Sequence, residues 1–180
     1  MPTTDTTTRE LPRLDLALPG ALRSEAPPRP PWRVLAALTA VSVLALVAVV
    51  LLGDVMNQPL LIPPLAASIG LIASVPDLPL AQPRNVIGGH LVCCLVGALT
   101  AVVLGHGILV AAVAGGLAVG ATLTLRMAHS PAAATAVIVA AAPTPIWTFT
   151  PLLLLATTLL VLVGVVDARI RGRAYPAYWW

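Results

Sequence analysis

The feature that most constrains the fold is a set of four long apolar stretches that contain almost no charged residue. They cover residues 34–52, 86–104, 108–125 and 148–166. The hydrocarbon core of a bilayer is about 30 Å thick and needs roughly 20 helical residues to cross it. Backbone polar groups in lipid must be paired within the chain, which favours helices. The sequence therefore predicts an all-α membrane protein with a bundle of four long spans.

Composition supports a membrane location and argues against a nucleic-acid partner. Only 9% of the residues are charged, whereas a soluble domain typically has about 25%. All ten cationic residues are arginines, and the formal net charge is +3. Most of these arginines lie in the two tails, beside apolar spans, where basic residues set orientation. We therefore expect both tails to be cytoplasmic and the protein to be integral to the plasma (inner) membrane.

The domain organisation follows from these stretches. Residues 1–33 are rich in Thr, Pro and Arg and lack the apolar core of a signal peptide, so a flexible tail is expected there. Residues 34–168 form the predicted transmembrane domain, and residues 169–180 form a basic and aromatic tail. The aromatic residues of this tail suit the headgroup region or a neighbouring subunit; they are Tyr175, Tyr178, Trp179 and Trp180.

Two short segments between the long ones share a pattern that indicates an internal duplication. Each begins with a proline and has a hydroxyl residue at its fifth position and a proline at its thirteenth. The same interval of 67 residues separates Pro64 from Pro131 and Ser68 from Thr135. A helix of this length covers only about 18 Å. We predict two repeat halves, about 34–104 and 108–168, each with a span, a half-helix and a second span.

The arginines bear on the number of crossings. If the half-helices re-enter the membrane, there are four crossings, and Arg84 and Arg126 lie on the outer side. If the half-helices complete a crossing with extended flanks, there are six, and every arginine lies on the inner side. We prefer six crossings, which make the two halves inverted with respect to each other, as in many transporters.

Inversion places the two half-helix starts, at Pro64 and Pro131, opposite each other near the bilayer midplane. Helix N-termini expose unpaired N–H groups and the positive end of the helix dipole. Proline suits the first helical turn. Ser68 and Thr135, one turn further on, either add donors or bond back to their own helices. Such a site is predicted to attract anions.

Polar residues gather around these starts in the sequence. Ionisable groups at membrane depth usually face a cavity and mark a pathway. Alternatives remain for several of them: the arginines as interface anchors, His129 as a helix cap, and His90 as a residue buried against a neighbouring helix. The predicted substrate-binding residues are Ser68, Arg84, Asn85, His90, Arg126, His129, Ser130 and Thr135, with Pro64 and Pro131 as structural helix starts.

No cofactor, metal or enzymatic chemistry is predicted. Cys93 and Cys94 are adjacent, and neighbouring helical side chains point about 100° apart, which disfavours a disulfide or a shared metal. We interpret both as packing residues. No spacing resembles a zinc site, and no nucleophile–base pair or carboxylate dyad is visible.

Residues 79–91, PLAQPRNVIGGHL, together with the earlier PPLAASIGLIASVPD and the later HSPAAATA, resemble the HPP family. These integral membrane proteins are named for a His-Pro-Pro motif. The resemblance covers residues 34–168. One departure is Ser130, which replaces the first proline after His129 and keeps the helix start at Pro131. Since members from plastids and cyanobacteria are linked to nitrite movement, the resemblance implies transport.

Two functions remain open from the sequence. The first is a channel or carrier for a small inorganic anion, with nitrite as the first candidate and the site at the two helix starts. The second is a non-transporting membrane scaffold or sensor in which the polar residues serve helix packing. Besides the lipid bilayer and the anion, we expect a homo-oligomer, because glycine-rich small bundles pack closely in lipid.

Overall fold

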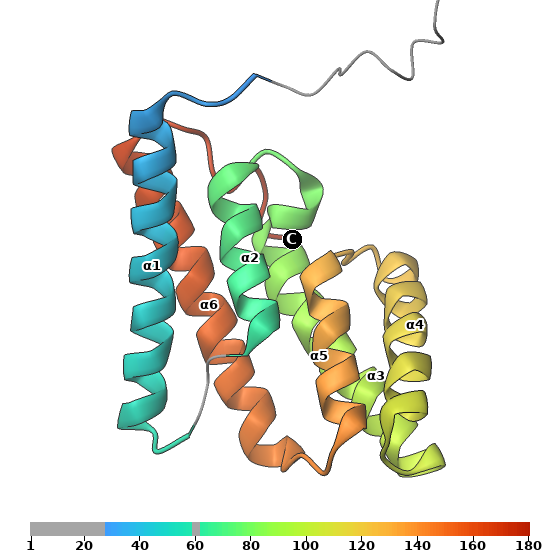
Figure 1. Cartoon of the computed structure of the whole chain (residues 1–180). Coiled ribbons are helices and arrows are strands. Elements are labelled where there is room, and N and C mark those ends of the chain that lie inside the picture. The colour runs from blue at the N-terminus through green and yellow to red at the C-terminus, as the bar shows by residue number, and fades with distance from the viewer. Residues whose placement is uncertain (1–27, 59–61) are drawn as a thin grey trace, which may run out of the picture. The chain divides into compact units, whose positions relative to one another are not determined.

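The computed structural model describes residues 28–58 and 62–180, and the described part contains helices and turns but no strand. The flexible tail predicted for residues 1–33 therefore lies almost entirely outside the described residues. Within residues 32–180 six α-helices follow one another (Figure 1). They are α1 (Trp32–Val55), α2 (Pro63–Ser74), α3 (Gly89–Leu104), α4 (Ile108–Thr124), α5 (Ser130–Ala141) and α6 (Ile146–Ile170), with a 3-10 turn η2 (Pro79–Ala81) and a π-helical turn η3 (Arg84–Gly88) before α3.

Three of these segments are long and apolar enough to cross a membrane: α1, the continuous run Arg84–Leu104, and α6. The prediction of four long spans is not confirmed, because α4 has only 17 residues. At 1.5 Å per residue α4 is about 25 Å long, short of a hydrocarbon core of about 30 Å. The half-helices α2 and α5 have 12 residues each, which supports the prediction that they are too short to cross alone.

Proline and glycine set the ends of the short elements. Ile62 and His129 are extended N-cap residues, and each is followed by proline in the first helical turn, where a missing N–H costs nothing. Both half-helices end shortly before the next proline. The turn between α3 and α4 contains two glycines with positive φ, Gly105 and Gly107, a conformation that other residues rarely adopt.

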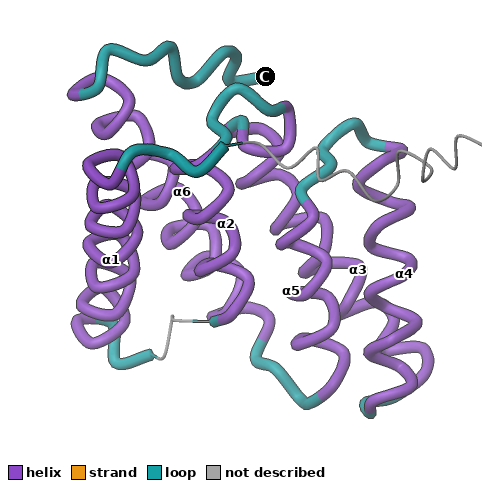
Figure 2. The backbone as a smooth tube through the Cα atoms, turned by 45° about the horizontal axis from the view of Figure 1, so that its top comes forward, coloured by secondary structure: helices purple, strands orange, loops and turns teal. Residues whose placement is uncertain are grey.

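The six helices form two groups of three, and consecutive helices run in opposite directions (Figures 1 and 2). In one group α3, α4 and α5 pack on one another; in the other α1, α2 and α6 do. The half-helix α2 therefore packs against α6, the last helix of the second half, and the half-helix α5 packs against α3, the last helix of the first half. The half-helices α2 and α5 also contact each other, as do α3 and α6, and these contacts join the two groups.

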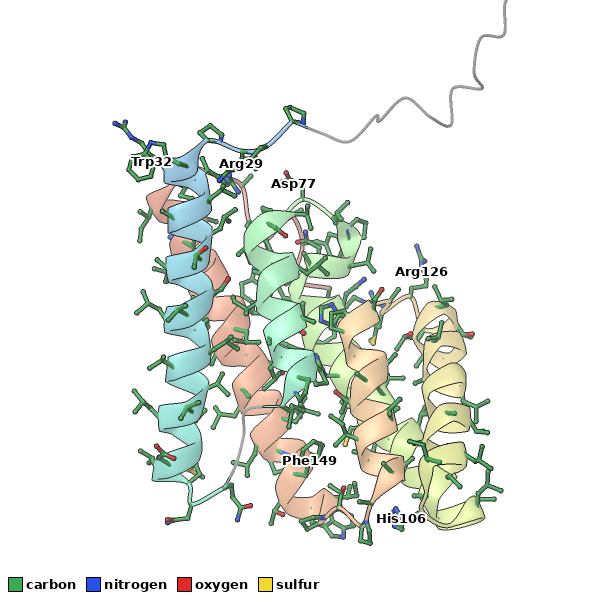
Figure 3. All side chains as sticks on the ribbon, viewed as in Figure 1. Arg29, Trp32, Asp77, His106, Arg126 and Phe149 are labelled. Atoms are coloured by element: carbon green, nitrogen blue, oxygen red, sulfur yellow. The ribbon has the colours of Figure 1, made fainter. Side chains whose placement is uncertain are left out.

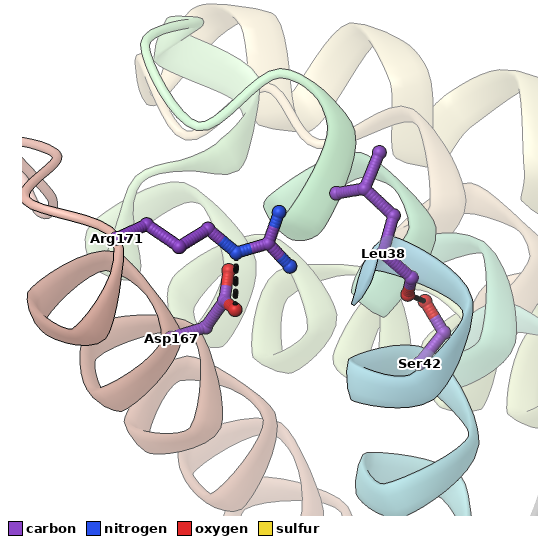
Figure 4. A network of polar contacts seen from close by, with 4 residues as sticks. All are labelled: Leu38, Ser42, Asp167 and Arg171. Atoms are coloured by element: carbon purple, nitrogen blue, oxygen red, sulfur yellow. Dashed lines mark hydrogen bonds and ion pairs between the residues drawn. The ribbon is translucent and has the colours of Figure 1, made fainter. Parts of the chain in front are cut away.

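The last turn of α6 lies beside the N-terminal part of α1. There Asp167 and Arg171 form an ion pair with an Nε–Oδ1 distance of 2.7 Å, while Ser42 on α1 bonds back to the carbonyl of Leu38 (Figure 4). Both charged side chains are mostly buried. A pair at this i,i+4 spacing stabilises a helix, so α6 stays helical beyond the predicted end of the span at residue 166.

Candidate functional site

The two half-helices meet where their first turns lie side by side, and four polar side chains fill the space between them. Ser68 comes from α2, His90 from α3, and His129 and Thr135 from the start of α5. All four are buried, with at most 2% of any of them exposed. Buried polar groups are costly unless they are hydrogen-bonded, and this cluster is hydrogen-bonded throughout. The name relay cluster is used below for these four residues.

Ser68 is the centre of the relay cluster. Its Oγ lies 3.0 Å from Nε2 of His90, 2.8 Å from Nε2 of His129 and 2.8 Å from the carbonyl oxygen of Pro64. The two imidazole rings are tilted by 56° with centroids 5.3 Å apart. Of the two alternatives derived from the sequence, the structure shows the bond back to the helix of Ser68, and the same hydroxyl also lies within hydrogen-bond distance of both histidines.

The outer nitrogen of each histidine also has a partner. Nδ1 of His90 lies 2.9 Å from Oγ1 of Thr135. Nδ1 of His129 lies 2.7 Å from the carbonyl oxygen of Leu80 in turn η2. A carbonyl oxygen only accepts, so Nδ1 of His129 carries a proton; this tautomer is inferred from the partner. The relay cluster thus runs from α5 through α3 and α2 to the turn before η3.

Two glycines permit the close approach that forms the cluster. A Cβ on Gly89 would lie 2.9 Å from both Cβ of His129 and the carbonyl oxygen of Met127. A Cβ on Gly88 would lie 2.7 Å from the sulfur of Met127. A side chain at position 89 would push the segment before α5 away from α3, and one at position 88 would displace the side chain of Met127. The Gly-Gly-His run in the sequence is therefore a packing requirement for bringing His90 and His129 together.

The π-helical turn η3 carries the next two predicted residues. Asn85 is 4% exposed; its Nδ2 donates to the carbonyl of Ala128, 2.9 Å away, and its Oδ1 has no hydrogen-bond partner among residues 28–58 and 62–180. Arg84 reaches the carbonyl of Leu125 at 3.4 Å, and its buried Nε has no partner. A cation at a helix C-terminus is favourable, so Arg84 helps to end α4. Single π-turns of this kind often lie at functional sites.

Two predicted residues lie outside the cluster. Arg126 is exposed and its side chain points away from the bundle (Figure 3). Its φ is +57°, and the N–H groups of Arg126 and Met127 bond to the carbonyls of Leu123 and Thr122. This is a Schellman motif, so the backbone of Arg126 terminates α4. Ser130 is exposed as well, and the structure places neither side chain against the relay cluster.

The C-terminal segment is hydrogen-bonded to the turn that contains Leu80. The sequence analysis did not predict this contact. The hydroxyl of Tyr175 donates to the carbonyl of Ala81 at 2.9 Å, and the N–H of Ala177 donates to Oε1 of Gln82 at 2.8 Å. Tyr175 is only 6% exposed, and burial raises the pKa of its phenol above the usual value. Unlike Tyr178, Trp179 and Trp180, it therefore packs inside its own chain rather than at a headgroup.

The remaining expectations about side chains are simple to locate. Cys93 and Cys94 are free and buried, as expected for packing residues. Cys94 lies 3.4 Å from the hydroxyl of Thr150 on α6. Within residues 28–58 and 62–180 no three His, Cys, Asp or Glu side chains are grouped as metal ligands require.

Comparison with known proteins agrees with this architecture. The family model for the HPP transmembrane region matches residues 27–176. The chain belongs to the HPP family. A transmembrane protein of Dictyostelium discoideum is 36% identical over 175 residues, which cover 89% of this chain and 61% of the relative. A second Dictyostelium discoideum transmembrane protein is 35% identical over 124 residues, which cover 64% of this chain and 40% of that relative.

The HPP match confirms the resemblance based on the motifs around Arg84, His90 and His129, and it establishes a membrane protein. The chain spans less than two thirds of the length of both curated relatives. No solved structure matches the chain.

Proposed function

We propose that this HPP protein transports a small inorganic anion, with nitrite as the first candidate, through the region between α2 and α5. The observation that carries the proposal is the relay cluster, in which two histidines and two hydroxyl residues are buried inside an apolar bundle. Ionisable side chains at membrane depth are expensive and usually belong to a solute or proton pathway. The membership in a family with members linked to nitrite movement supports the same substrate.

We include in the proposal an inverted duplication, which two observations support. The bounds of α2 and α5 differ by the interval of 67 residues seen in the sequence. The same interval relates two glycine contacts: Gly97 on α3 lies against Val139 on α5, and Gly164 on α6 lies against Ile72 on α2. Two halves related in this way, each with three alternating segments, form the arrangement in which many transporters hold their substrate between half-helices.

Charge supports six crossings with both termini in the cytoplasm. The six arginines of residues 32–180 all lie at helix ends on the same side of the bundle as the start of α1. Arg126 and Asp77 lie toward that end, whereas His106 and Phe149 lie toward the other (Figure 3). Arginine-rich ends remain in the cytoplasm, so we place this end there and the protein in the plasma (inner) membrane.

The described conformation is closed, because side chains fill the space between the half-helix starts. Passage of a solute requires the imidazoles of His90 and His129 to move apart and expose the first turns of α2 and α5. Those turns carry partial positive charge and favour an anion over a cation. Arg84, at the arginine-rich end, adds positive charge on the same side as the start of α5.

We extend the proposal to a homo-oligomer. Gly116 and Gly120 lie on the exposed face of α4, and a Cβ at either position would meet no atom of the described residues within 4 Å. Small residues spaced in this way allow a second helix to approach closely in lipid. Cross-linking of a cysteine introduced at residue 116 tests this extension, and a monomer at every protein-to-lipid ratio would contradict it.

Uptake of nitrite into proteoliposomes tests the function. Ser68→Ala removes the hydroxyl at the centre of the relay cluster, and we expect the initial rate to fall by about tenfold or more, the equivalent of about 1.4 kcal/mol. Ser74→Ala is the matched control, since Ser74 is on the same helix, is exposed, and bonds only to the carbonyl of Gly70. Its rate should stay close to that of the wild type.

The same experiment separates transport from the alternative, a non-transporting scaffold or sensor. That alternative is favoured by one observation, the complete internal pairing of the histidine nitrogens. A scaffold would move no nitrite, and Ser68→Ala would only lower the melting temperature in detergent. We assign the protein no enzymatic activity; absence of uptake in wild-type vesicles would reject the transport proposal.

A further inference from the structure

The relay cluster has five polar contacts, but in its neutral form its four side chains have only four protons that can form hydrogen bonds. Five contacts join it: Thr135 to His90, His90 to Ser68, Ser68 to His129, Ser68 to the carbonyl of Pro64, and His129 to the carbonyl of Leu80. Each contact requires a proton between its two heavy atoms. With both imidazoles neutral, each of the four side chains contributes one proton. Four protons serve five contacts.

The neutral form has a fixed direction. Because the carbonyl of Leu80 only accepts, the single proton of neutral His129 is on Nδ1 and its Nε2 accepts from the hydroxyl of Ser68. Ser68 then accepts from Nε2–H of His90, whose Nδ1 accepts from the hydroxyl of Thr135. In this form the proton of Ser68 is shared between two acceptors, Nε2 of His129 and the carbonyl of Pro64, both at 2.8 Å.

One additional proton gives every contact its own hydrogen. It binds Nε2 of His129, which then donates to Oγ of Ser68. The Ser68 hydroxyl rotates to donate to the carbonyl of Pro64 alone, and its two lone pairs accept from the two histidines. One N–H bond forms, no covalent bond breaks within the cluster, and the protein gains one positive charge. The geometry around Ser68 therefore accommodates a single imidazolium without the loss of any hydrogen bond.

The surroundings do not offset that charge. The half-helices α2 and α5 carry no ionisable side chain, and α6 carries its ionisable residues only near its last turn. The other titratable or charged groups on the elements around the pair are Asp77, Arg84, Cys93, Cys94, Arg126 and Tyr175. Asp77 is exposed and has no hydrogen bond to the cluster. An isolated buried cation is strongly disfavoured, so the additional proton requires a counter-ion.

We propose that the relay cluster binds a proton and the transported anion together, so that the solute crosses as an electroneutral pair or as its conjugate acid. This inference rests on the proposed function. The first turn of α5, which begins beside His129, supplies partial positive charge for the anion, and the anion stabilises the imidazolium in turn. By linkage the anion and the proton each increase the affinity for the other. The substrate class is therefore the anion of a weak acid.

The transport test uses the full chain in phosphatidylethanolamine–phosphatidylglycerol vesicles that contain a pH-sensitive dye. An inward nitrite gradient should acidify the lumen with one proton per nitrite, and the rate should not respond to an imposed potassium diffusion potential. Vesicles without protein and vesicles with Ser68→Ala give the background from diffusion of nitrous acid. Nitrite entry that follows the potential without acidification overturns the inference but leaves the proposed function intact. Absence of entry overturns the proposed function.

A spectroscopic test does not depend on transport. The chain has three histidines, and His106 is exposed in the turn between α3 and α4. His106→Gln therefore leaves only His90 and His129. Solid-state nitrogen NMR of this histidine-labelled variant in lipid at neutral pH should show two neutral imidazoles without nitrite and one imidazolium with saturating nitrite. Spectra that do not change with nitrite overturn the inference. Adding Ser68→Ala should abolish the change, and an undiminished imidazolium signal in that double variant also contradicts it.

Discussion

Helices α3, α4 and α5 contact one another through alanine and glycine, whereas α1, α2 and α6 contact one another through leucine, isoleucine and valine. The buried cluster of the first group contains Cys93 and six alanines, at positions 111, 114, 118, 132, 136 and 140. The other cluster lies mainly on α1, α2 and α6, with Val86, Cys94 and Val139 joining it from η3, α3 and α5. It contains larger side chains, among them Leu65, Ile69, Ile72, Leu153 and Leu160. In lipid, helix association relies on close van der Waals packing rather than on the hydrophobic effect. Helices α3, α4 and α5 therefore pack through close approach of their backbones, whereas α1, α2 and α6 pack through interdigitated side chains.

The chemistry of the relay cluster is also unequal between the two halves. The 67-residue interval pairs Ser68 with Thr135, but it pairs His129 with Ile62 and His90 with Thr157. Both halves supply a buried hydroxyl on a half-helix, and each imidazole has an apolar or hydroxyl counterpart. The two half-helices therefore match in length and in one buried hydroxyl, while the two histidines have no counterpart in the other half.

The largest expected effect tests the difference in packing. A Cβ on Gly97 would lie 2.7 Å from the backbone oxygen of Ala136 and 2.9 Å from its Cα. Backbone atoms of a packed helix cannot move aside cheaply, so Gly97→Ala should lower the free energy of unfolding by about 3 kcal/mol. A Cβ on Gly164 would meet Cγ2 of the buried, β-branched Ile72 and the ring of Tyr175. These side chains can shift further than a helix backbone, so Gly164→Ala should cost less, about 2 kcal/mol.

Reversible unfolding of both variants by sodium dodecyl sulfate in mixed micelles measures this difference. Gly70→Ala on α2 is the control, because Gly70 is exposed and a Cβ there would meet no atom of the described residues within 4 Å, and alanine is the better helix former. An equal or larger loss for Gly164→Ala than for Gly97→Ala would contradict the distinction between backbone packing and side-chain packing.

A smaller effect concerns the C-terminal segment, which contributes Tyr175 to the cluster of larger side chains centred on α1, α2 and α6. Tyr175→Phe removes the hydrogen bond to Ala81, and the free energy of unfolding should fall by about 1 kcal/mol. Tyr178→Phe should change it by less than about 0.5 kcal/mol, because the contact of Tyr178 with Pro79 is long, at 3.5 Å, and exposed.

The pH dependence of stability gives a second measure of the same residue. Burial raises the pKa of Tyr175 in the folded state, so the folded protein retains a proton that the unfolded chain loses. The stability from this residue is complete below the ordinary tyrosine pKa of about 10 and is lost as the pH rises above it. Tyr175→Phe should flatten the wild-type decline above that pH in detergent unfolding curves; an equal decline in both proteins would argue against burial of Tyr175.

The smallest expected effect comes from a substitution that gives both half-helices the same first two residues. Helix α2 begins with Pro63 and Pro64, whereas α5 begins with Ser130 and Pro131. His129 is already extended, with φ of −144° and ψ of 99°, as a residue before proline prefers. Ser130→Pro should therefore leave stability unchanged or raise it by up to about 0.5 kcal/mol. Calorimetry in detergent measures this, and a loss above 1 kcal/mol would mean that the exposed Ser130 hydroxyl or N–H has a partner.

Much of the fold could be predicted because apolar length and proline positions act locally. The runs at 34–52, 86–104 and 148–166 all form helices, and the half-helices lie within two residues of their predicted bounds. His90 is buried against neighbouring helices, one of the alternatives derived from the sequence. The predicted span at 108–125 also forms a helix, α4, which ends at the Schellman motif around Arg126, but with 17 residues it is not confirmed as a long span.

The partners of the relay cluster were not predictable in the same way. The carbonyls of Leu80 and Pro64 carry no side-chain signal, and the placement of Tyr175 depends on a contact 94 positions distant in the chain. The charge of Arg126 suggested a binding residue. Its positive φ shows instead that its backbone forms the end of α4. Such roles depend on which backbone groups the packed helices leave unpaired.

The sequence by itself determined that this chain is a helical membrane protein with two matching half-helices, because hydrophobic length, proline and periodic small residues act through local backbone physics. Tertiary structure alone decided that His90 and His129 share one serine hydroxyl, and that Arg126 and Ser130 stay outside. The physical reason is that hydrogen-bond geometry between distant segments is fixed only when Gly89 and Gly97 let the helix that carries His90 approach the backbones of Met127 and Ala136.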